Sequence, residues 1–494
     1  MLAVVAIAFL PCLGNGFVDW DDDVLVTANP FVQTLSWANL SAMFSRPITN
    51  AYHPLPFLVW ALEYRLWGEA PLGYHLLSLA LHLATAALVF RWVVRLEGSL
   101  PAAAAAALWF GVHPMRAESV AWVSDQKDLL AGLFFMASLL AYERSLRGKS
   151  GKWYPAALGF FLLAGLCKAT AVALPAVLLL VDFLRRRPID RRSVLEKIPF
   201  FTLAGLIALA AIVSRGSFEA SIAQELAQES YPLPYRLYLV GHRLVFYFLQ
   251  RTVAPTRGIE TLYPDVGGPH VAGVVAWGTV LALLVAGVAL SARFTRKGIF
   301  GGGFFVIALS PALATVSYGY TADRFSYIPS IGLAYLVGVT VAAALRKAAD
   351  RRFPRALIVV ASVAGFSALA ATSWRQCGVW KDSVSLWSDA ADKFSDQPAS
   401  VNLGAALTNR GRAWLVLDEN RRALQDLEKA VPIAPVRHHA LFYRAIVLAA
   451  LGERERALDD LREALRIAPD YAPARDFFEE LVSAEPGPPP GGGR

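Results

Sequence analysis

Long apolar runs alternate with short polar loops along most of the chain. The runs lie at about 72–93, 101–113, 128–142, 153–167, 169–184, 198–213, 271–291, 303–317, 327–345 and 356–373. Several approach the roughly 20 residues that an α-helix needs to cross a bilayer. The pattern predicts an all-α, polytopic membrane bundle of about 11–12 transmembrane helices.

A further apolar run covers residues 1–13 and is short for a crossing. We expect either a start further upstream or a thin, tilted first helix. The run lacks a basic segment before it and an A-x-A cleavage site, so we expect no cleavable signal peptide.

Basic residues mark one face of the predicted bundle. They gather in five loops: Arg91/Arg95; Arg144/Arg147/Lys149/Lys152; Arg185/Arg186/Arg187/Arg191/Arg192/Lys197; Arg293/Arg296/Lys297; and Arg346/Lys347/Arg351/Arg352/Arg355. Loops rich in Lys and Arg face the cytoplasm, which places loops 14–71, 114–127, 214–270 and 318–326 on the opposite face. The number of membrane crossings agrees with these assigned faces only if residues 237–253 do not fully cross the membrane. We therefore expect a re-entrant or interfacial segment there. The alternative is an ordinary crossing and a miscount elsewhere.

The composition supports the membrane assignment and excludes other classes. The chain has 494 residues, of which 56% are hydrophobic and only 17% are charged, whereas soluble domains carry about a quarter charged residues. The net charge is +8, and the basic residues lie in short loops between apolar runs. This distribution is typical of the charge bias that sets membrane topology, so it does not indicate a nucleic-acid partner. Three scattered cysteines are too few for a disulfide framework or a metal site.

The C-terminal part is charged and carries an internal repeat. Three small or helix-ending residues recur after 34 positions: Ala423, Ala430 and Pro435 return as Ala457, Ala464 and Pro469. This period and these offsets are the tetratricopeptide signature of paired helices. We therefore expect a membrane domain over 1–375, a connecting helix over 376–403, a tetratricopeptide α-solenoid over 404–483 and a disordered tail over 484–494. The solenoid would hold repeats 404–437 and 438–471 and a capping helix.

Four carboxylates follow the first apolar run. Asp19, Asp21, Asp22 and Asp23 lie at its predicted outer end. Carboxylates at a bilayer edge cost free energy unless they face water or have partners, so the cluster is a candidate functional site. The alternative is a solvated loop or a helix N-cap.

The second outer loop carries more charge between two short apolar runs. At helical spacing Glu118, Trp122 and Asp125 share one face, which predicts an interfacial helix. The simpler interpretation is a helix at the headgroups with Lys127 and Asp128 solvated.

A third element on this face is the segment 321–327. Arg324 is a rare cation on the basic-poor face, and a guanidinium there suits bidentate binding of a phosphate. The alternatives are a structural pair with Asp323 or an arginine that snorkels to the interface. Lys168 and Arg251 lie on the same predicted face, although each alone is an ordinary interface anchor. Together, these acids and cations predict a site for an anionic, lipid-linked substrate and a nucleophile that needs a base. Hydrolase-triad, Walker A and Rossmann patterns are not visible.

These segments carry a family resemblance in one order along the chain. They are FVDWDDDVLVTANPFVQ (17–33), YHPLPFLVWALEYRLWG (52–68), GYHLLSLALHL (73–83), HPMRAESVAWVSDQKDLL (113–130), CKATAVALP (167–175), ADRFSYIPSIG (322–332) and WKDSVSLW (380–387). The chain resembles bacterial relatives of the transmembrane and tetratricopeptide repeat-containing (TMTC-type) proteins of the GT-C glycosyltransferase superfamily. For animal members this implies protein O-mannosylation from dolichyl-phosphate mannose on the lumenal side.

For a bacterial relative, the resemblance implies a multi-pass protein of the cytoplasmic membrane that uses a polyprenyl-phosphate sugar. The active site and the repeats would lie on the periplasmic side. The chain departs from its eukaryotic relatives at His53-Pro54, where they tend to have Arg-Pro, and it carries only about two repeats.

The resemblance and the residues together suggest an inverting hexose transfer to a hydroxyl, expected to be Ser or Thr of a translocated protein. Asp21 or Asp22 would act as base, because a hydroxyl attacks well only when its proton is taken. Glu118 would orient the sugar or the acceptor. Arg324, then Arg251 and Lys168, would stabilise the departing phosphate. The remaining candidate substrate-binding residues are Asp323, His53, His113, Lys127 and Asp128.

We expect no cofactor. Asp21, Asp22 and Glu118 offer the oxygen ligands of Mg²⁺ or Mn²⁺, but nearby cations can neutralise one phosphate without a metal. The expected partners are the lipid-linked donor, membrane lipids and a protein bound by the repeats. Alternatives are a lipid, glycan or oligosaccharide transfer, or a non-enzymatic membrane anchor for the repeats. A transporter is disfavoured because no broken, inverted-repeat helices are visible.

Overall fold

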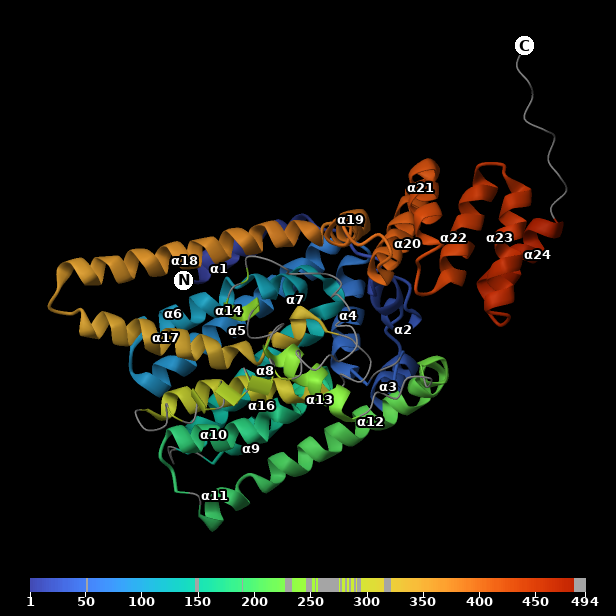
Figure 1. The fold of residues 1–494 in the computed structure, drawn as a ribbon. Coiled ribbons are helices and arrows are strands. Elements are labelled where there is room, and N and C mark those ends of the chain that lie inside the picture. The colour runs from blue at the N-terminus through green and yellow to red at the C-terminus, as the bar shows by residue number, and fades with distance from the viewer. Residues whose placement is uncertain are drawn as a thin grey trace. The chain divides into compact units, whose positions relative to one another are not determined.

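A computed structural model gives the architecture of the chain (Figure 1). It describes residues 1–49, 52–146, 151–188, 190–226, 233–245, 251–253, 255, isolated positions between 275 and 290, 295–314 and 321–483. Most of the predicted run 271–291, residues 246–250 of the predicted re-entrant segment and the predicted disordered tail lie outside the described residues.

The first of two compact units ends at Lys381. Its helices are α1 (Leu2–Phe9), α2 (Pro30–Gln33), α3 (Trp37–Ser45), α4 (Pro54–Trp67), α5 (Pro71–Glu97), α6 (Leu100–Gly111), α7 (Ala117–Ala121), α8 (Gln126–Ser145), α9 (Trp153–Cys167), α10 (Leu174–Leu184), α11 (Arg191–Leu195), α12 (Ile198–Leu226), α13 (Leu233–His242), α14 (Arg251–Val253), α16 (Arg296–Ala314), α17 (Ser330–Lys347) and α18 (Arg352–Val379). Short 3-10 helices cover Leu10–Gly14, Pro114–Arg116, Val123–Asp125, Ala169–Ala173 and Asp323–Ser326, and a short π-helix covers Asp23–Thr27. No β-strand occurs in the part of the chain that the structure describes.

Within the described residues of this unit, four helices are long and apolar enough to cross a membrane. They are Pro71–Glu97, Arg191–Ser214, Ser330–Lys347 and Arg352–Val379, and shorter apolar helices cover Leu2–Gly14, Leu100–Gly111, Trp153–Cys167 and Ala169–Leu184. The prediction of an all-α, multi-pass membrane protein is confirmed.

Small residues let the helices of the bundle pack closely. Helix α6 lies between α5 and α17 and holds a run of alanines, most of them buried. Gly338 on α17 faces α6 so closely that an added Cβ would lie 2.3 Å from the carbonyl oxygen of Ala102. Helix α8 packs along α9 and also contacts α5 (Figure 1). Long helices that run side by side bring their ends to the same level, so loops distant in sequence meet there.

The first outer stretch folds back on the bundle around its own apolar cluster. Val26, Val32, Met43, Phe57 and Trp60 are buried there together with Val123 of the second outer loop. Helix α4 begins at Pro54, a residue suited to the first turn of a helix. This packing fixes the acidic segment 19–23 against the second outer loop.

The second unit begins at Asp382 and contains the repeat helices. They are α19 (Ser383–Lys393), α20 (Val401–Val416), α21 (Asn420–Ala430), α22 (Arg437–Ala450), α23 (Arg454–Ile467) and α24 (Ala472–Ser483). The turn between α22 and α23 uses Gly452 at φ +82°, a conformation that favours glycine.

Each of the two helix pairs in this unit contains an ion pair between its helices, and the second ion pair lies 34 residues after the first. Arg410 donates to both carboxylate oxygens of Asp426 at 2.7 and 2.8 Å, and Arg444 donates in the same way to Asp460 at 2.7 Å. A bidentate pair of this kind fixes the relative position of two helices as well as adding energy.

Candidate functional site

Asp22 ties the acidic segment to the second outer loop. Its Oδ1 accepts hydrogen bonds from the Ser124 backbone N at 2.9 Å and from the Ser124 hydroxyl at 2.5 Å, and its Oδ2 accepts from the Val18 N at 3.0 Å. The side chain is buried. Burial raises the pKa of Asp22 to about 6, although the hydrogen bonds from Ser124 and Val18 lower it. Asp22 therefore has a positioning role.

Asp21, next to it in the sequence, has different surroundings. Its side chain is half-buried, and its carboxylate accepts no hydrogen bond from any residue that the structure describes. Burial raises the pKa of Asp21, while the positive charges of Lys127 and Arg324 lower it. The charges of Lys127 and Arg324 therefore act on an Asp21 carboxylate that accepts no hydrogen bond from the described residues.

The second outer loop does not form the single helix expected from its spacing. Helix α7 ends at Ala121, because Trp122 has extended backbone angles, and a tight turn covers Val123–Asp125. The loop is also buried, so the simpler interpretation of a helix at the headgroups with Lys127 and Asp128 solvated is wrong: Asp128 is 4% exposed and Lys127 is half-buried. The break turns Ser124 toward Asp22.

Glu118 and Arg324 meet across 206 positions of sequence. The Arg324 guanidinium forms an ion pair with Glu118, and the Arg324 backbone N donates to the second Glu118 oxygen at 2.8 Å. The guanidinium carbon also lies 5.1 Å from the centroid of the Trp122 ring. The two predicted site residues therefore occupy one place, with Glu118 holding the arginine.

Further charges are buried beside this pair. Asp125 is fully buried, its Oδ1 lies 3.9 Å from the Arg324 Nε, and neither carboxylate oxygen has a hydrogen-bond partner among the described residues. Burial raises the pKa of Asp125 well above its usual value. Lys168 forms a 2.5 Å ion pair with Asp128. Lys127 lies 5.4 Å over the Trp122 ring and has no carboxylate partner in the described ranges.

Arg116 is a buried cation that the sequence reasoning did not select. Its Nη2 donates to the Ser326 hydroxyl at 2.6 Å, and its guanidinium lies 5.4 Å from the Tyr327 ring centroid. Its Nε and Nη1 have no hydrogen-bond partner within the described part of the chain. Burial lowers the pKa of Arg116 to about 10, which leaves it charged at neutral pH. The sequence signal that could have identified Arg116 was its position in the segment HPMRAES (113–119) of the second outer loop.

Three tryptophans lie together beside the acidic segment. Trp122 and Trp380 stack with ring centroids 5.4 Å apart, and Trp20 lies 6.2 Å from Trp122. Two hydrogen bonds also join this part of the first outer loop to the chain at the end of α18. The Gly16 backbone N donates to the Lys381 carbonyl oxygen at 2.8 Å, and the Asn15 side-chain amide donates to the Cys377 carbonyl oxygen at 3.0 Å. The end of α18 is thus fixed to the first outer loop.

The remaining predicted residues lie around the same loops. His113 accepts from Met115 N and contacts the Thr252 carbonyl at 3.0 Å, and burial lowers its pKa to about 3, so it is neutral. That contact brings Arg251, the residue before Thr252, to the second outer loop. Asp323 is buried next to Arg324, and its charge acts on Arg116. His53 precedes α4 as its N-cap residue.

Two of the three carboxylates named as possible Mg²⁺ or Mn²⁺ ligands, those of Asp22 and Glu118, are engaged by protein donors. No group of three His, Cys, Asp or Glu residues in the described ranges is arranged to hold a metal ion. Asp22 already accepts three hydrogen bonds and Glu118 is paired with Arg324, so these two carboxylates do not fit the role of shared ligands.

Two parts of the chain match protein families. Residues 46–216 match the dolichyl-phosphate-mannose-protein mannosyltransferase family, and residues 438–471 match the tetratricopeptide repeat. The second range coincides with the second repeat expected from the sequence.

Relatives among characterised proteins point the same way. Human protein O-mannosyl-transferase TMTC3 is 35% identical over 132 residues, which are 26% of this chain and 14% of that protein. Drosophila melanogaster Tmtc2 is 32% identical over 36% of this chain and 21% of its own length, and Caenorhabditis elegans F38B6.6 is 23% identical over 83% and 60%. The chain thus spans less than two thirds of the length of these relatives. The family resemblance expected from the sequence motifs is confirmed.

Among solved structures, ArnT from Cupriavidus metallidurans bound to undecaprenyl phosphate matches with a TM-score of 0.38 and 17% identity. The match covers 92% of this chain and 78% of that one.

Proposed function

We propose that this member of the TMTC-type protein O-mannosyltransferase family is a membrane glycosyltransferase. It transfers a hexose, expected to be mannose, from a polyprenyl-phosphate sugar to Ser or Thr hydroxyls of proteins, with inversion, on the face opposite the basic loops. That face is the periplasmic side of a bacterial cytoplasmic membrane. The family match over residues 46–216 and the names of the relatives support the reaction class.

One observation carries the proposal: the positive charges of Lys127 and Arg324 act on a carboxylate that accepts no hydrogen bond from the described residues. Asp21 accepts no hydrogen bond from the described residues and is close enough to Lys127 and Arg324 for their charges to lower its pKa. The Asp22 carboxylate already accepts hydrogen bonds from three donors. The sequence left Asp21 and Asp22 as equal candidates for the base, and these contacts favour Asp21.

In the proposed step, the acceptor oxygen attacks the anomeric carbon as Asp21 takes the hydroxyl proton. The bond from that carbon to the phosphate oxygen breaks, and its electron pair leaves on the phosphate. The transition state resembles an oxocarbenium ion, as in glycoside hydrolysis. The leaving group is already an anion, so cations replace a general acid.

Lys127 is the cation best placed to receive that phosphate. It is half-buried and forms no ion pair in the described ranges, whereas Arg324 is held by Glu118 and Lys168 by Asp128. Arg116 adds two nitrogens, Nε and Nη1, that have no hydrogen-bond partner among the described residues. A buried polar group without a partner calls for an explanation, and a bound ligand supplies one. Preorganised cations in a dry site stabilise developing negative charge strongly.

The test uses membranes that contain the full chain and a polyprenyl-phosphate hexose labelled in the sugar. We expect label to appear in protein and to be released by β-elimination, as an O-linked sugar is. The Lys127→Met variant should lower transfer about 10- to 100-fold, because one charge-assisted contact of about 1.5–3 kcal/mol is lost. The Lys152→Met variant, which alters a lysine of a basic loop, is the control.

Label found only in lipid would contradict the protein acceptor. No transfer at all, with loss of a protein complex in a deletion strain, would favour the alternative of a membrane anchor.

A further inference from the structure

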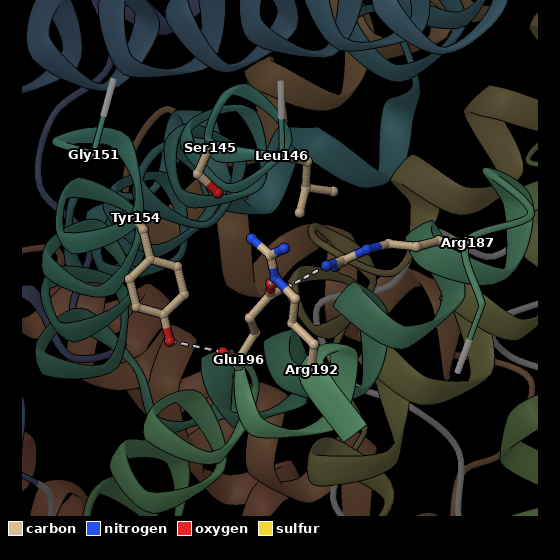
Figure 2. A pocket seen from close by; sticks show the side chains of 7 residues that line it. All are labelled: Ser145, Leu146, Gly151, Tyr154, Arg187, Arg192 and Glu196. Carbon is tan, nitrogen blue, oxygen red and sulfur yellow. Dashed lines mark hydrogen bonds and ion pairs between the residues drawn. The ribbon is translucent and has the colours of Figure 1, made fainter. Parts of the chain in front are cut away.

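A second charged site lies at the other ends of helices α8 and α9. The cavity, of about 510 Å³, is lined by Ser145, Tyr154, Arg187, Arg192 and Glu196 together with Leu146 and Gly151 (Figure 2). Asp125 and Asp128 lie at the start of α8, whereas Ser145 is its last residue. Twenty helical residues span about 30 Å, so this cavity is separated from the candidate site by roughly the thickness of a bilayer core.

Two arginines in the cavity share one carboxylate. Glu196 accepts from the Arg187 Nη2 at 2.6 Å and from the Arg192 Nε at 3.2 Å (Figure 2). The nearby Asp182 pairs with Lys197 and lies 3.5 Å from the Arg187 Nη1, which also donates to the Tyr142 hydroxyl at 3.2 Å. Arg187, Arg192 and Lys197 thus pair with two carboxylates, those of Glu196 and Asp182.

Donor capacity remains unused in this cluster. A guanidinium has five N–H donors, and Arg192 uses only its Nε among the described contacts. Its side chain is 84% exposed, so the two terminal nitrogens are open to a ligand. Arginine binds phosphate oxygens with a pair of parallel N–H groups. The cavity therefore suits a phosphate-bearing anion.

The surroundings of the cavity are those of a membrane interface. Helix α9 begins at Trp153, α10 ends at Leu184 and α12 begins at Ile198, all apolar helices. Leu195 and Ile198 are 50% and 49% exposed beside Glu196. Trp153, with the Arg144 guanidinium 4.1 Å from its ring centroid, and Tyr154 provide the aromatic residues that gather at headgroup level.

We propose that this cavity binds the phosphodiester headgroup of an anionic phospholipid on the face that carries the basic loops. The phosphate takes the free terminal nitrogens of Arg192, and the acyl chains follow the exposed apolar side chains at the start of α12. Basic pockets between membrane helices are known to hold anionic headgroups in this way. A free phosphate anion would present the same chemistry without the apolar contact.

The experiment measures lipid retained by the full chain in native mass spectrometry, after purification and addition of phosphatidylglycerol or phosphatidylcholine. We expect phosphatidylglycerol to be retained over phosphatidylcholine. We expect Arg192→Ala to lower that retention about tenfold, as the loss of a charge-assisted contact implies. Because Arg192 is largely exposed, this variant should fold. Arg355→Ala, an exposed arginine at the start of α18, removes the same charge elsewhere and should retain the lipid.

Two outcomes would overturn the proposal. Equal loss in Arg192→Ala and Arg355→Ala would show that retention follows overall charge and not this cavity. Displacement of the lipid by millimolar inorganic phosphate, with equal binding of phosphate alone, would show that the cavity takes the free anion. Sugar transfer is measured on the same samples, so a failure here is distinguishable from a failure of the proposed function.

Discussion

Two neighbouring aspartates, Asp21 and Asp22, divide the work of the acidic segment. Asp22 accepts three hydrogen bonds that join the first outer loop to the second, while the carboxylate of Asp21 has no such donor among the described residues. Spacing in the sequence cannot separate them, because the difference comes from Ser124, about a hundred positions away. Folding brings that donor to one aspartate only.

Removing the Ser124 hydroxyl should change how the site responds to pH. The hydroxyl stabilises ionised Asp22, whose pKa burial has raised to about 6. Loss of this hydrogen bond raises that pKa further. If ionised Asp22 holds the outer loops in place, transfer by Ser124→Ala should begin to fail at a higher pH than transfer by the wild type. The pH–rate profile in membranes gives the answer.

Ser119→Ala is the matched control for that profile. Ser119 is equally buried in the same loop, and its hydroxyl has no hydrogen-bond partner in the described part of the chain. The acid limb of its profile should coincide with that of the wild type. An unshifted limb in Ser124→Ala would refute the coupling between Asp22 and activity.

At the scale of elements, helices were predicted well where apolar length alone decides the structure. The runs 72–93, 153–167 and 356–373 lie within α5, α9 and α18. The second outer loop was predicted poorly, because helical spacing does not show that Trp122 takes extended angles. The contact of Glu118 with Arg324 and the burial of Asp125 both depend on tertiary packing. The residue types could therefore suggest a shared site, but they could not predict which acid pairs with which cation.

The end of α18 connects the outer loops through Trp380. This side chain is 3% exposed and stacks on Trp122, whose ring also lies against Arg324 and Lys127. Trp380→Ala should cost about 3–5 kcal/mol locally and strongly lower sugar transfer. Thermal unfolding of the membrane-extracted chain, measured beside the transfer rate, tests this.

Trp374→Ala on the same helix provides the comparison. Trp374 is 46% exposed, so its truncation should leave both stability and transfer near the wild-type values. Equal effects of the two variants would indicate a general weakening of α18 and not a link to the site.

At the scale of the whole molecule, charge and position predict which loops share a face. The acidic segment and Lys168 lie at one end of the apolar helices, and Arg187 and Arg192 lie at the other. The positive-inside rule then predicts that the acidic segment lies outside the cytoplasm. A membrane-impermeant maleimide should label Asp23→Cys in intact cells and should label Arg192→Cys only after lysis.

The native cysteines favour this labelling experiment, because Cys12, Cys167 and Cys377 are all buried. Labelling of position 192 in intact cells, with position 23 protected, would reverse the topology. A donor exposed only outside the cytoplasm could then not reach Asp21.

The most direct measurement is the single-turnover rate of sugar transfer by Asp21→Asn, compared with Asp23→Asn as a neighbouring charge-matched control. Asp21 should act as the base, so its amide should lose a factor of about 10² to 10⁴ in rate at unchanged donor binding, while Asp23→Asn stays close to the wild type. A rate for Asp21→Asn within a few-fold of the wild type would contradict its assignment as the base.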